Sequence, residues 1–204
     1  LKSKLFNEVY VITDSKLIYD CLKDYGGQVL MSSTEHISGS DRIAEFSSDI
    51  STDIIVNIQG DEPFIDVNSL SKLINLFKTD VNNNIDLASL MQKTSDVNEI
   101  TNPNVVKVVV DSNNFALYFS RSPIPYVRSG DGKTSFFKHI GVYAFRKKSL
   151  LDFYNSQPTP LEKTEKLEQL RYLEHGKKIM MIETNYNGLG IDTMDDLINA
   201  RKII

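Results

Sequence analysis

The sequence of 204 residues contains one cysteine, Cys21, and no tryptophan. A lone cysteine cannot form an intramolecular disulfide, and it excludes a zinc site built from several cysteines. No apolar run approaches the roughly 20 residues that a membrane-spanning helix needs, so we expect no membrane partner. No signal-peptide pattern is present, and together with the low cysteine content this favours a cytoplasmic protein.

An excess of positive charge is also missing. Lys and Arg number 23 against 27 Asp and Glu, which gives a formal net charge of −4. Proteins that neutralise many phosphates usually carry a basic surface, so we expect no nucleic-acid partner. A site for a single nucleotide fits this balance, because it needs only a few local cations. With 41% hydrophobic and 25% charged residues, the chain can build a full core, and we expect one domain over residues 1–204.

Strand-like runs alternate with helical patterns along most of the chain. Continuous apolar or β-branched runs at 9–13, 54–58 and 179–183 are typical of buried parallel strands. In the segment 70–77, apolar residues recur at i, i+3, i+4 and i+7, as on one face of a helix. This alternation predicts an α/β fold, with a Rossmann-like, mostly parallel sheet and helices on both of its faces.

The middle of the chain departs from this alternation. Two β-rich runs, 105–110 and 115–120, flank the turn sequence Asp111–Asn114, and a further strand is predicted at 139–145. We interpret residues 103–146 as an antiparallel β insertion that extends the sheet.

Glycine and proline mark the ends of the other helices. One helix is predicted to bury an apolar face over residues 17–25 and to end at Gly26. A long helix is predicted from the break at Pro158–Pro160 to His175, where Gly176 closes it.

Two acidic residues follow predicted strands. Asp61 comes directly after the strand 54–58, and Asp192 comes after the strand 179–183. In an open α/β sheet, ligands bind outside the carboxyl ends of the strands. Mg²⁺ takes one or two protein carboxylates together with phosphate oxygens and water, so these residues could hold it if the two strand ends meet. Either residue could equally be a turn or helix-cap residue.

The segment 36–42 places a glycine and an arginine at the start of a predicted helix. Backbone amides at a helix start favour anions, and the Arg42 guanidinium could bind a phosphate or a base carbonyl. Because Ser-Gly-Ser-Asp is also an ordinary helix cap, this segment alone is a weak indication of a nucleotide site.

Several short motifs occur in order along the chain. They are His36-x-Ser-Gly-x-x-Arg42, Asn57-x-Gln-Gly-Asp-Glu-Pro63, Tyr118-Phe-Ser-Arg121, Lys138-His-Ile-Gly-x-Tyr143, Pro158-x-Pro-Leu-Glu162 and Leu167-Glu-Gln-Leu-Arg171. From near residue 8 to the C-terminus, this series resembles the 3-deoxy-manno-octulosonate cytidylyltransferases, or CMP-Kdo synthetases. Sialic acid cytidylyltransferases share the fold, but the second and the last motif fit the Kdo group better.

The resemblance implies a nucleotide-diphospho-sugar transferase fold and a reaction. CTP and Kdo would give CMP-Kdo and pyrophosphate with Mg²⁺ as cofactor, for lipopolysaccharide biosynthesis, in a homodimer that uses the region 103–146. Two other functions stay open. One is a cytidylyltransferase for sialic acid or another acidic sugar, and the other is an inactive module that binds nucleotide or sugar.

The resemblance also implies roles for particular residues. Asp61 and Asp192 would be the catalytic pair that holds magnesium. The nucleotide would contact Ser38, Gly39, Arg42 and Gln59. Kdo would contact Arg121, His139, Tyr143, Glu168 and Gln169. Without the resemblance, His139 and Tyr143, four apart on one strand and therefore on one face, would be interpreted as packing residues, and Glu168 as part of a solvated helix face.

Members of this family begin with a strand and a Gly/Arg/Lys-containing loop that cradles the triphosphate of CTP. The sequence starts at Leu1, beyond that segment. A βαβ unit takes about 30 or more residues, so we expect a segment of that order to precede Leu1 in the parent protein.

Overall fold

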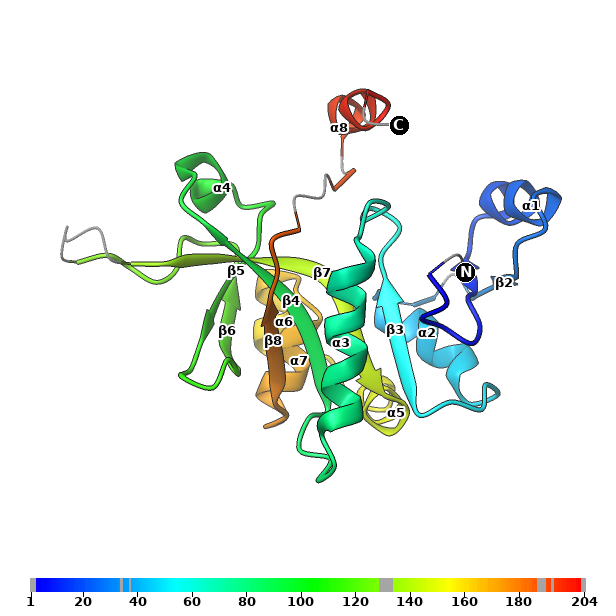
Figure 1. The fold of residues 1–204 in the computed structure, drawn as a ribbon, viewed down its shortest axis with the longest axis horizontal. Helices are drawn as coiled ribbons and strands as arrows, with labels where there is room; N and C mark the ends of the chain where they lie inside the picture. The colour runs from blue at the N-terminus through cyan, green and yellow to red at the C-terminus, as the bar shows by residue number, and fades with distance from the viewer. Residues whose placement is uncertain are drawn as a thin grey trace.

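The computed structural model describes residues 3–33, 35–36, 38–128, 134–186, 190–191 and 193–202. A six-stranded sheet lies at the centre of the molecule (Figure 1). Its strands are β3 (Ile54–Ile58), β4 (Leu87–Thr94), β5 (Lys107–Val110), β6 (Ala116–Ser120), β7 (Phe136–Arg146) and β8 (Ile179–Glu183). β7 pairs with β4 along one side, and with β5 and then β3 along the other. Since β3, β4, β5 and β8 all run opposite to β7, most strands share one direction, as predicted.

The antiparallel insertion is confirmed. β5 pairs with β6, and both β5 and β4 pair with β7 in antiparallel register. The turn between β5 and β6 is built by Asp111, whose Oδ1 accepts hydrogen bonds from the backbone amides of Asn113 and Phe115 at 2.8 Å. Asn114 has φ 64°, a left-handed conformation that asparagine tolerates well.

Helices cover both faces of the sheet, as predicted. They are α1 (Lys16–Asp24), α2 (Gly39–Ser47), α3 (Val67–Thr79), α4 (Val97–Thr101), α5 (Lys147–Tyr154), α6 (Pro160–Glu165), α7 (Gln169–Glu174) and α8 (Met194–Ala200). α3 packs Leu70, Leu73 and Phe77 into one core cluster, while α2, α5 and α7 contribute to a second. In Figure 1, α3 lies in front of the strands and α6 and α7 lie behind them.

The central strand β4 is absent from the sequence prediction. Its residues Leu87 to Met91 are all buried, and it pairs with both β7 and β8. The sequence Leu-Ala-Ser-Leu-Met-Gln-Lys-Thr is rich in residues with high helix propensity and has no run of β-branched residues. Packing between two strands decides its conformation, because strand preference depends strongly on context.

The predicted long helix after Pro160 is wrong. The chain forms two short helices, α6 and α7, because Lys166 adopts a left-handed conformation with φ 53° and ψ 51°. This break puts Glu168 and Gln169 at the start of α7 instead of in the middle of a helix.

The first helix forms where the sequence predicts it, and Gly26 follows it with φ 74°. Its expected burial is wrong: α1 has no buried residue, and Leu17 and Tyr25 are 81% and 86% exposed. β1 (Val11–Thr13) and β2 (Val29–Met31) form a separate two-stranded parallel sheet next to it. Cys21 is exposed.

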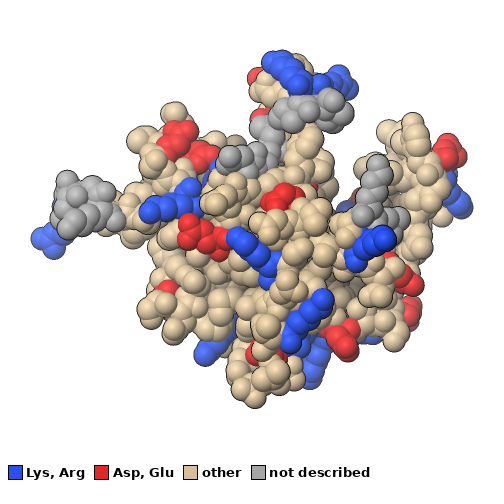
Figure 2. All heavy atoms as spheres, in the orientation of Figure 1, with Lys and Arg blue, Asp and Glu red and all other residues tan. Residues whose placement is uncertain are grey.

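On the face shown in Figure 2, basic and acidic side chains are interspersed and do not gather into a patch of one sign. Among the helices of the described ranges, none is long and apolar enough to cross a lipid bilayer.

Candidate functional site

The two parallel strands β1 and β2 end close to the start of α2. The backbone amide of Ser32, after β2, donates to the carbonyl of Thr13 at the end of β1 at 3.0 Å. Arg42 of α2 reaches back to Asp14, with Nη2 2.7 Å from Oδ2. Polar groups at the carboxyl ends of parallel strands are where α/β folds bind ligands.

The start of α2, residues 38–42, is the predicted nucleotide segment. Ser38 caps the helix: its Oγ accepts from the backbone amide of Asp41 at 3.1 Å and donates to Asp41 Oδ2 at 2.8 Å. Ser40, in the first turn of the same helix, contacts Glu168. Its backbone amide donates to Glu168 Oε2 at 3.2 Å, and its Oγ donates to Glu168 Oε1 at 3.0 Å. The anion at this helix start is therefore a carboxylate of the chain itself.

This contact joins two groups of predicted residues. Glu168, in the predicted sugar segment, contacts the predicted nucleotide segment although it is 128 positions away from Ser40. Burial raises the pKa of Glu168, and the hydrogen bonds from Ser38 and Ser40 offset only part of this effect. A buried carboxylate held in this way is stabilised by its donors and costly to leave without them.

Asn57 and Gln59, at the end of β3, lie beside the nucleotide segment. A Cβ added to Gly39 would lie 3.8 Å from Asn57 Nδ2 and 3.9 Å from Gln59 Nε2. Within the described residues, the buried Asn57 Nδ2 and Arg42 Nε have no hydrogen-bond acceptor. Because buried donors in proteins nearly always have a partner, these two point to an acceptor supplied by a ligand. Asn57 is not among the residues predicted from the sequence, although it opens the Asn-Ile-Gln-Gly motif.

Asp61 follows β3 in the same region. The backbone amide of Ile191 donates to the Asp61 carbonyl at 2.8 Å, so the segment that leads to Asp192 is held against Asp61. Asp192 itself lies outside the described residues. Across the part of the chain that is described, no three His, Cys, Asp or Glu side chains form a metal-binding group. A magnesium ion needs only one or two protein carboxylates when phosphates supply the other ligands, so the residues at this position fit it.

His139 and Tyr143 of β7 share one face, as predicted, with their ring centroids 5.3 Å apart. Tyr143 Oη donates to Gln169 Oε1 at 3.3 Å, and burial raises the pKa of Tyr143 well above its usual value, with the charges of Glu168 and Asp61 adding to it. His139 Nε2 lies 2.8 Å from Ser89 Oγ, and burial lowers the pKa of His139 to about 3. Near neutral pH, the site therefore presents a neutral imidazole and a protonated phenol.

Arg121 is placed differently from the expectation. Its Nε donates to the Glu165 carbonyl at 2.8 Å and its Nη1 to the Pro103 carbonyl at 2.9 Å, while its backbone amide donates to Glu165 Oε2 at 3.0 Å. The guanidinium thus ties together neighbouring segments of the chain, and its contact with a sugar carboxylate stays a prediction.

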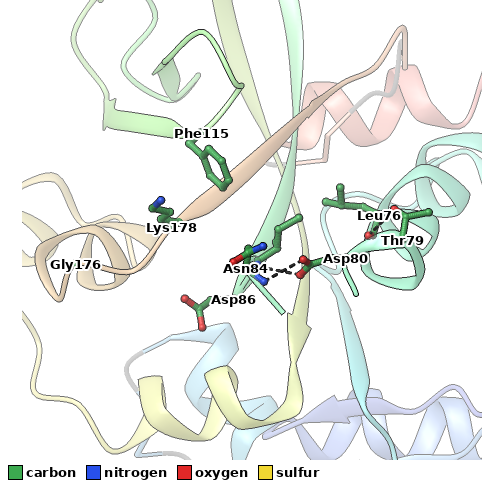
Figure 3. A pocket seen from close by; sticks show the side chains of 9 residues that line it. Leu76, Thr79, Asp80, Asn84, Asp86, Phe115, Gly176 and Lys178 are labelled. Atoms are coloured by element: carbon green, nitrogen blue, oxygen red, sulfur yellow. Dashed lines mark hydrogen bonds between the residues drawn. The ribbon is translucent and has the colours of Figure 1, made fainter. Parts of the chain in front are cut away.

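A cavity of about 720 Å³ opens at the opposite end of the sheet (Figure 3). It is lined by Asp86 and Lys178, which directly precede β4 and β8, and by Asp80 after α3. Despite its size, we do not place the functional site there. It lies at the amino ends of the strands, whereas the cluster of buried donors lies at their carboxyl ends.

Comparison with known proteins identifies the family of the chain. The sequence pattern of the cytidylyltransferase family matches residues 1–179. The chain is 54% identical over 204 residues to the 3-deoxy-manno-octulosonate cytidylyltransferase of Flavobacterium johnsoniae, covering 100% of this chain and 84% of that protein. The protein of the same name from Christiangramia forsetii is 52% identical over 204 residues, with coverage of 100% and 82%.

Comparison with solved structures also identifies this family. The structure of CMP:2-keto-3-deoxy-manno-octonic acid synthetase complexed with CTP matches with a TM-score of 0.88 at 36% identity, covering 96% of this chain and 80% of that one. A 4-diphosphocytidyl-2C-methyl-D-erythritol synthase from Anaerococcus prevotii matches with a TM-score of 0.60 at 18% identity over 99% of this chain and 80% of that one, which shows the fold alone.

Proposed function

The chain belongs to the cytidylyltransferase family, among the 3-deoxy-manno-octulosonate cytidylyltransferases, and from this premise we propose that it transfers CMP from CTP to Kdo for lipopolysaccharide assembly. The anomeric hydroxyl of Kdo attacks the α-phosphorus in line. An oxygen–phosphorus bond forms as the bond to the β-phosphate oxygen breaks, pyrophosphate leaves with the electron pair, and the hydroxyl proton passes to solvent.

The observation that carries this proposal is the pair of hydrogen bonds from Ser40 to Glu168. These bonds bring the predicted nucleotide segment and the predicted sugar segment within hydrogen-bond distance. A group-transfer enzyme needs its two substrates side by side in a fixed orientation, and positioning of this kind supplies much of the rate enhancement.

On the nucleotide side, we propose that CTP accepts hydrogen bonds from the buried donors Asn57 Nδ2 and Arg42 Nε. Gln59 and the helix start at Ser38 and Gly39 lie next to them and complete the contacts to cytidine and phosphate.

On the sugar side, the neutral polar groups of His139, Tyr143 and Gln169 suit the hydroxyls of a polyol, because they can donate and accept without burying a new charge. Glu168 accepts from a hydroxyl in the same way. We retain Arg121 as the partner of the sugar carboxylate, a role that requires it to release one of its main-chain contacts.

For the cofactor we infer Mg²⁺, with Asp61 and Asp192 as the residues that would hold it. When bound there, it would neutralise phosphate charge and lower the pKa of the attacking hydroxyl. Asp61 is suited to this task because its turn follows β3 directly and is tied to the segment before Asp192 through Ile191.

We further propose a homodimer, with the β insertion 103–146 as its contact region, acting in the cytoplasm where CTP is made. Leu117 and Tyr126 expose 62% and 88% of their surfaces in this region, which is apolar area that a partner could cover. Light scattering after gel filtration tests the dimer: a monomer mass would contradict it.

The test of the reaction is pyrophosphate release by the full-length protein with CTP and Mg²⁺, using Kdo and N-acetylneuraminate as parallel acceptors. We expect release with Kdo alone. Release with N-acetylneuraminate alone would identify a sialic acid enzyme, and no release with either sugar, in a protein that binds CTP, would indicate a binding module.

A further inference from the structure

Arg171, the last residue of the Leu-Glu-Gln-Leu-Arg motif, has no role in the proposed chemistry, yet it is almost completely buried. Its side chain is 2% exposed. All three guanidinium nitrogens are bonded: Nε to Glu162 Oε2 at 2.8 Å, Nη2 to Glu162 Oε1 at 2.5 Å, and Nη1 to Asp41 Oδ1 at 3.2 Å. The guanidinium carbon also lies 4.0 Å from the centre of the Phe153 ring.

These contacts run from the sugar segment to the nucleotide segment. Arg171 lies on α7, whose first turn carries Glu168 and Gln169. Asp41, which accepts from Arg171, lies on α2 and also accepts from Ser38 Oγ at 2.8 Å. A second connection between the same two helices is the bond from Ser40 to Glu168.

The helix break at Lys166 brings Glu162 and Arg171 into contact. The left-handed Lys166 turns the chain between Glu162 and Arg171, so that two short helices present these residues to each other. Glu162 is itself fixed, since its Oε2 accepts from the backbone amide of Thr159 at 3.1 Å. The guanidinium therefore joins α2, α6 and α7 at one point.

Resting on the function proposed above, we propose that Arg171 is a positioning residue that couples the two substrate-binding segments. It holds Ser38–Asp41 in register with Glu168 and Gln169, so that bound CTP and bound sugar meet in reacting geometry. Lysine cannot replace it, because a single ammonium cannot fork onto one carboxylate while contacting another. Both segments therefore lose their relative placement when the guanidinium is removed.

Arg146 offers a matched control at the other end of the sheet. Its Nη2 is 2.7 Å from Asp80 Oδ2, its Nε donates to the Ile85 carbonyl at 3.1 Å, and its guanidinium lies 5.3 Å from the Phe77 ring centre. It is thus a partly buried arginine paired with a carboxylate and an aromatic ring, at the cavity edge and away from the substrate segments.

The experiment compares Arg171→Lys with Arg146→Lys in the full-length protein. For Arg171→Lys we expect the KM values for CTP and for Kdo to rise together and kcat/KM to fall by about 100-fold, the effect of a shift of about 1 Å between reacting groups. Arg146→Lys should lose comparable melting temperature and keep both KM values within about twofold.

Amide hydrogen exchange without substrates is the second measurement. Residues 38–47 should exchange about tenfold faster or more in Arg171→Lys than in Arg146→Lys, because local opening follows the loss of local contacts. If Arg171→Lys does not fold, Asp41→Asn breaks the same link from the other side and takes its place. Equal kinetics in the two lysine variants at matched stability, or equal exchange at residues 38–47, would overturn the proposal. If the wild-type protein makes no pyrophosphate with Kdo, the proposed function fails, while hydrogen exchange still decides whether Arg171 holds the two segments together.

Discussion

Replacing Glu168 by glutamine should raise the melting temperature at neutral pH and weaken the binding of Kdo. Burial raises the pKa of Glu168, and its hydrogen bonds from Ser38 and Ser40 lower it by less. The folded protein therefore binds a proton at Glu168 more tightly than the unfolded chain does. The stability linked to this proton is fully present below the unfolded pKa of 4.5 and is lost as the pH rises through the higher folded pKa.

The magnitude follows from the two opposing effects. A hydrogen bond to a charged acceptor contributes about 1.5–3 kcal/mol and one between neutral groups about 0.5–1.5 kcal/mol, so losing the charge weakens each contact by about 1 kcal/mol. The raised pKa of Glu168 means that relief from burying the charge exceeds this loss. In a domain of this size, each 1 kcal/mol of net gain raises Tm by about 2–4 °C.

Glu165, three positions earlier, is a control with the opposite sign. Burial alone would raise the pKa of Glu165, but hydrogen bonds from the Arg121 amide and from Ser120 Oγ outweigh burial and lower it. Its charge therefore stabilises the fold above the unfolded pKa of 4.5, and this stability is lost as the pH falls through the lower folded pKa. Glu165→Gln should melt below the wild type at neutral pH.

Calorimetric melts of the wild type and both variants at about pH 5 and about pH 8 measure these effects. We expect Glu168→Gln to melt above the wild type at the higher pH, with a smaller difference at the lower pH, and its KM for Kdo to rise. A Glu168→Gln variant that melts below the wild type at the higher pH would refute the reasoning, because its charged hydrogen bonds would then outweigh burial.

Three further predictions concern single residues. Asp61→Asn should keep the wild-type Tm and reduce pyrophosphate release by about 100-fold or more, since a carboxylate proposed to hold Mg²⁺ is lost; normal turnover in this variant would remove Asp61 from the metal site. His139→Gln should lose less stability than the wild type between about pH 7 and about pH 5, because burial lowers the pKa of His139 from 6.5 to about 3 and only the unfolded wild-type chain takes up the proton there; equal losses in calorimetric melts would contradict this. Lys107 is 0% exposed and its ammonium donates to the carbonyls of Asn102, Val105 and Arg121. Lys107→Met should therefore cost at least about 2 kcal/mol in urea unfolding, and a loss below about 1 kcal/mol would show that these carbonyls find other donors.

Local sequence patterns predicted those helices, strands and turns whose local preference is the same as the structure that they adopt in the fold. The period of apolar residues located α3, and the turn sequence after β5 located the hairpin. β4 was missed because a fully buried strand needs no alternation, and its residues also favour helices. The helix break at Lys166 was missed because no glycine or proline marks it, and the surrounding contacts of Glu162 with Arg171 fix the left-handed turn.

The site was predicted mainly as a set of motifs, not as an arrangement. That His139 and Tyr143 share a face follows from strand geometry, and their ring contact confirms it. The bonds from Ser40 to Glu168 join residues 128 positions apart, and no local pattern predicts such a pairing. Asn57 was overlooked because an amide at a strand end has many ordinary uses, and only its buried, unsatisfied Nδ2 distinguishes it.

We propose that CTP binds at the carboxyl edge of the sheet, against α2 and the end of β3, and not in the cavity near Asp80 and Lys178. Amide hydrogen exchange of the full-length protein, with and without CTP and Mg²⁺, tests it directly. CTP should slow exchange in residues 38–47 and 57–61 and leave exchange in residues 80–86 and 176–178 unchanged. Slower exchange around the cavity, with none at the carboxyl edge, would contradict it.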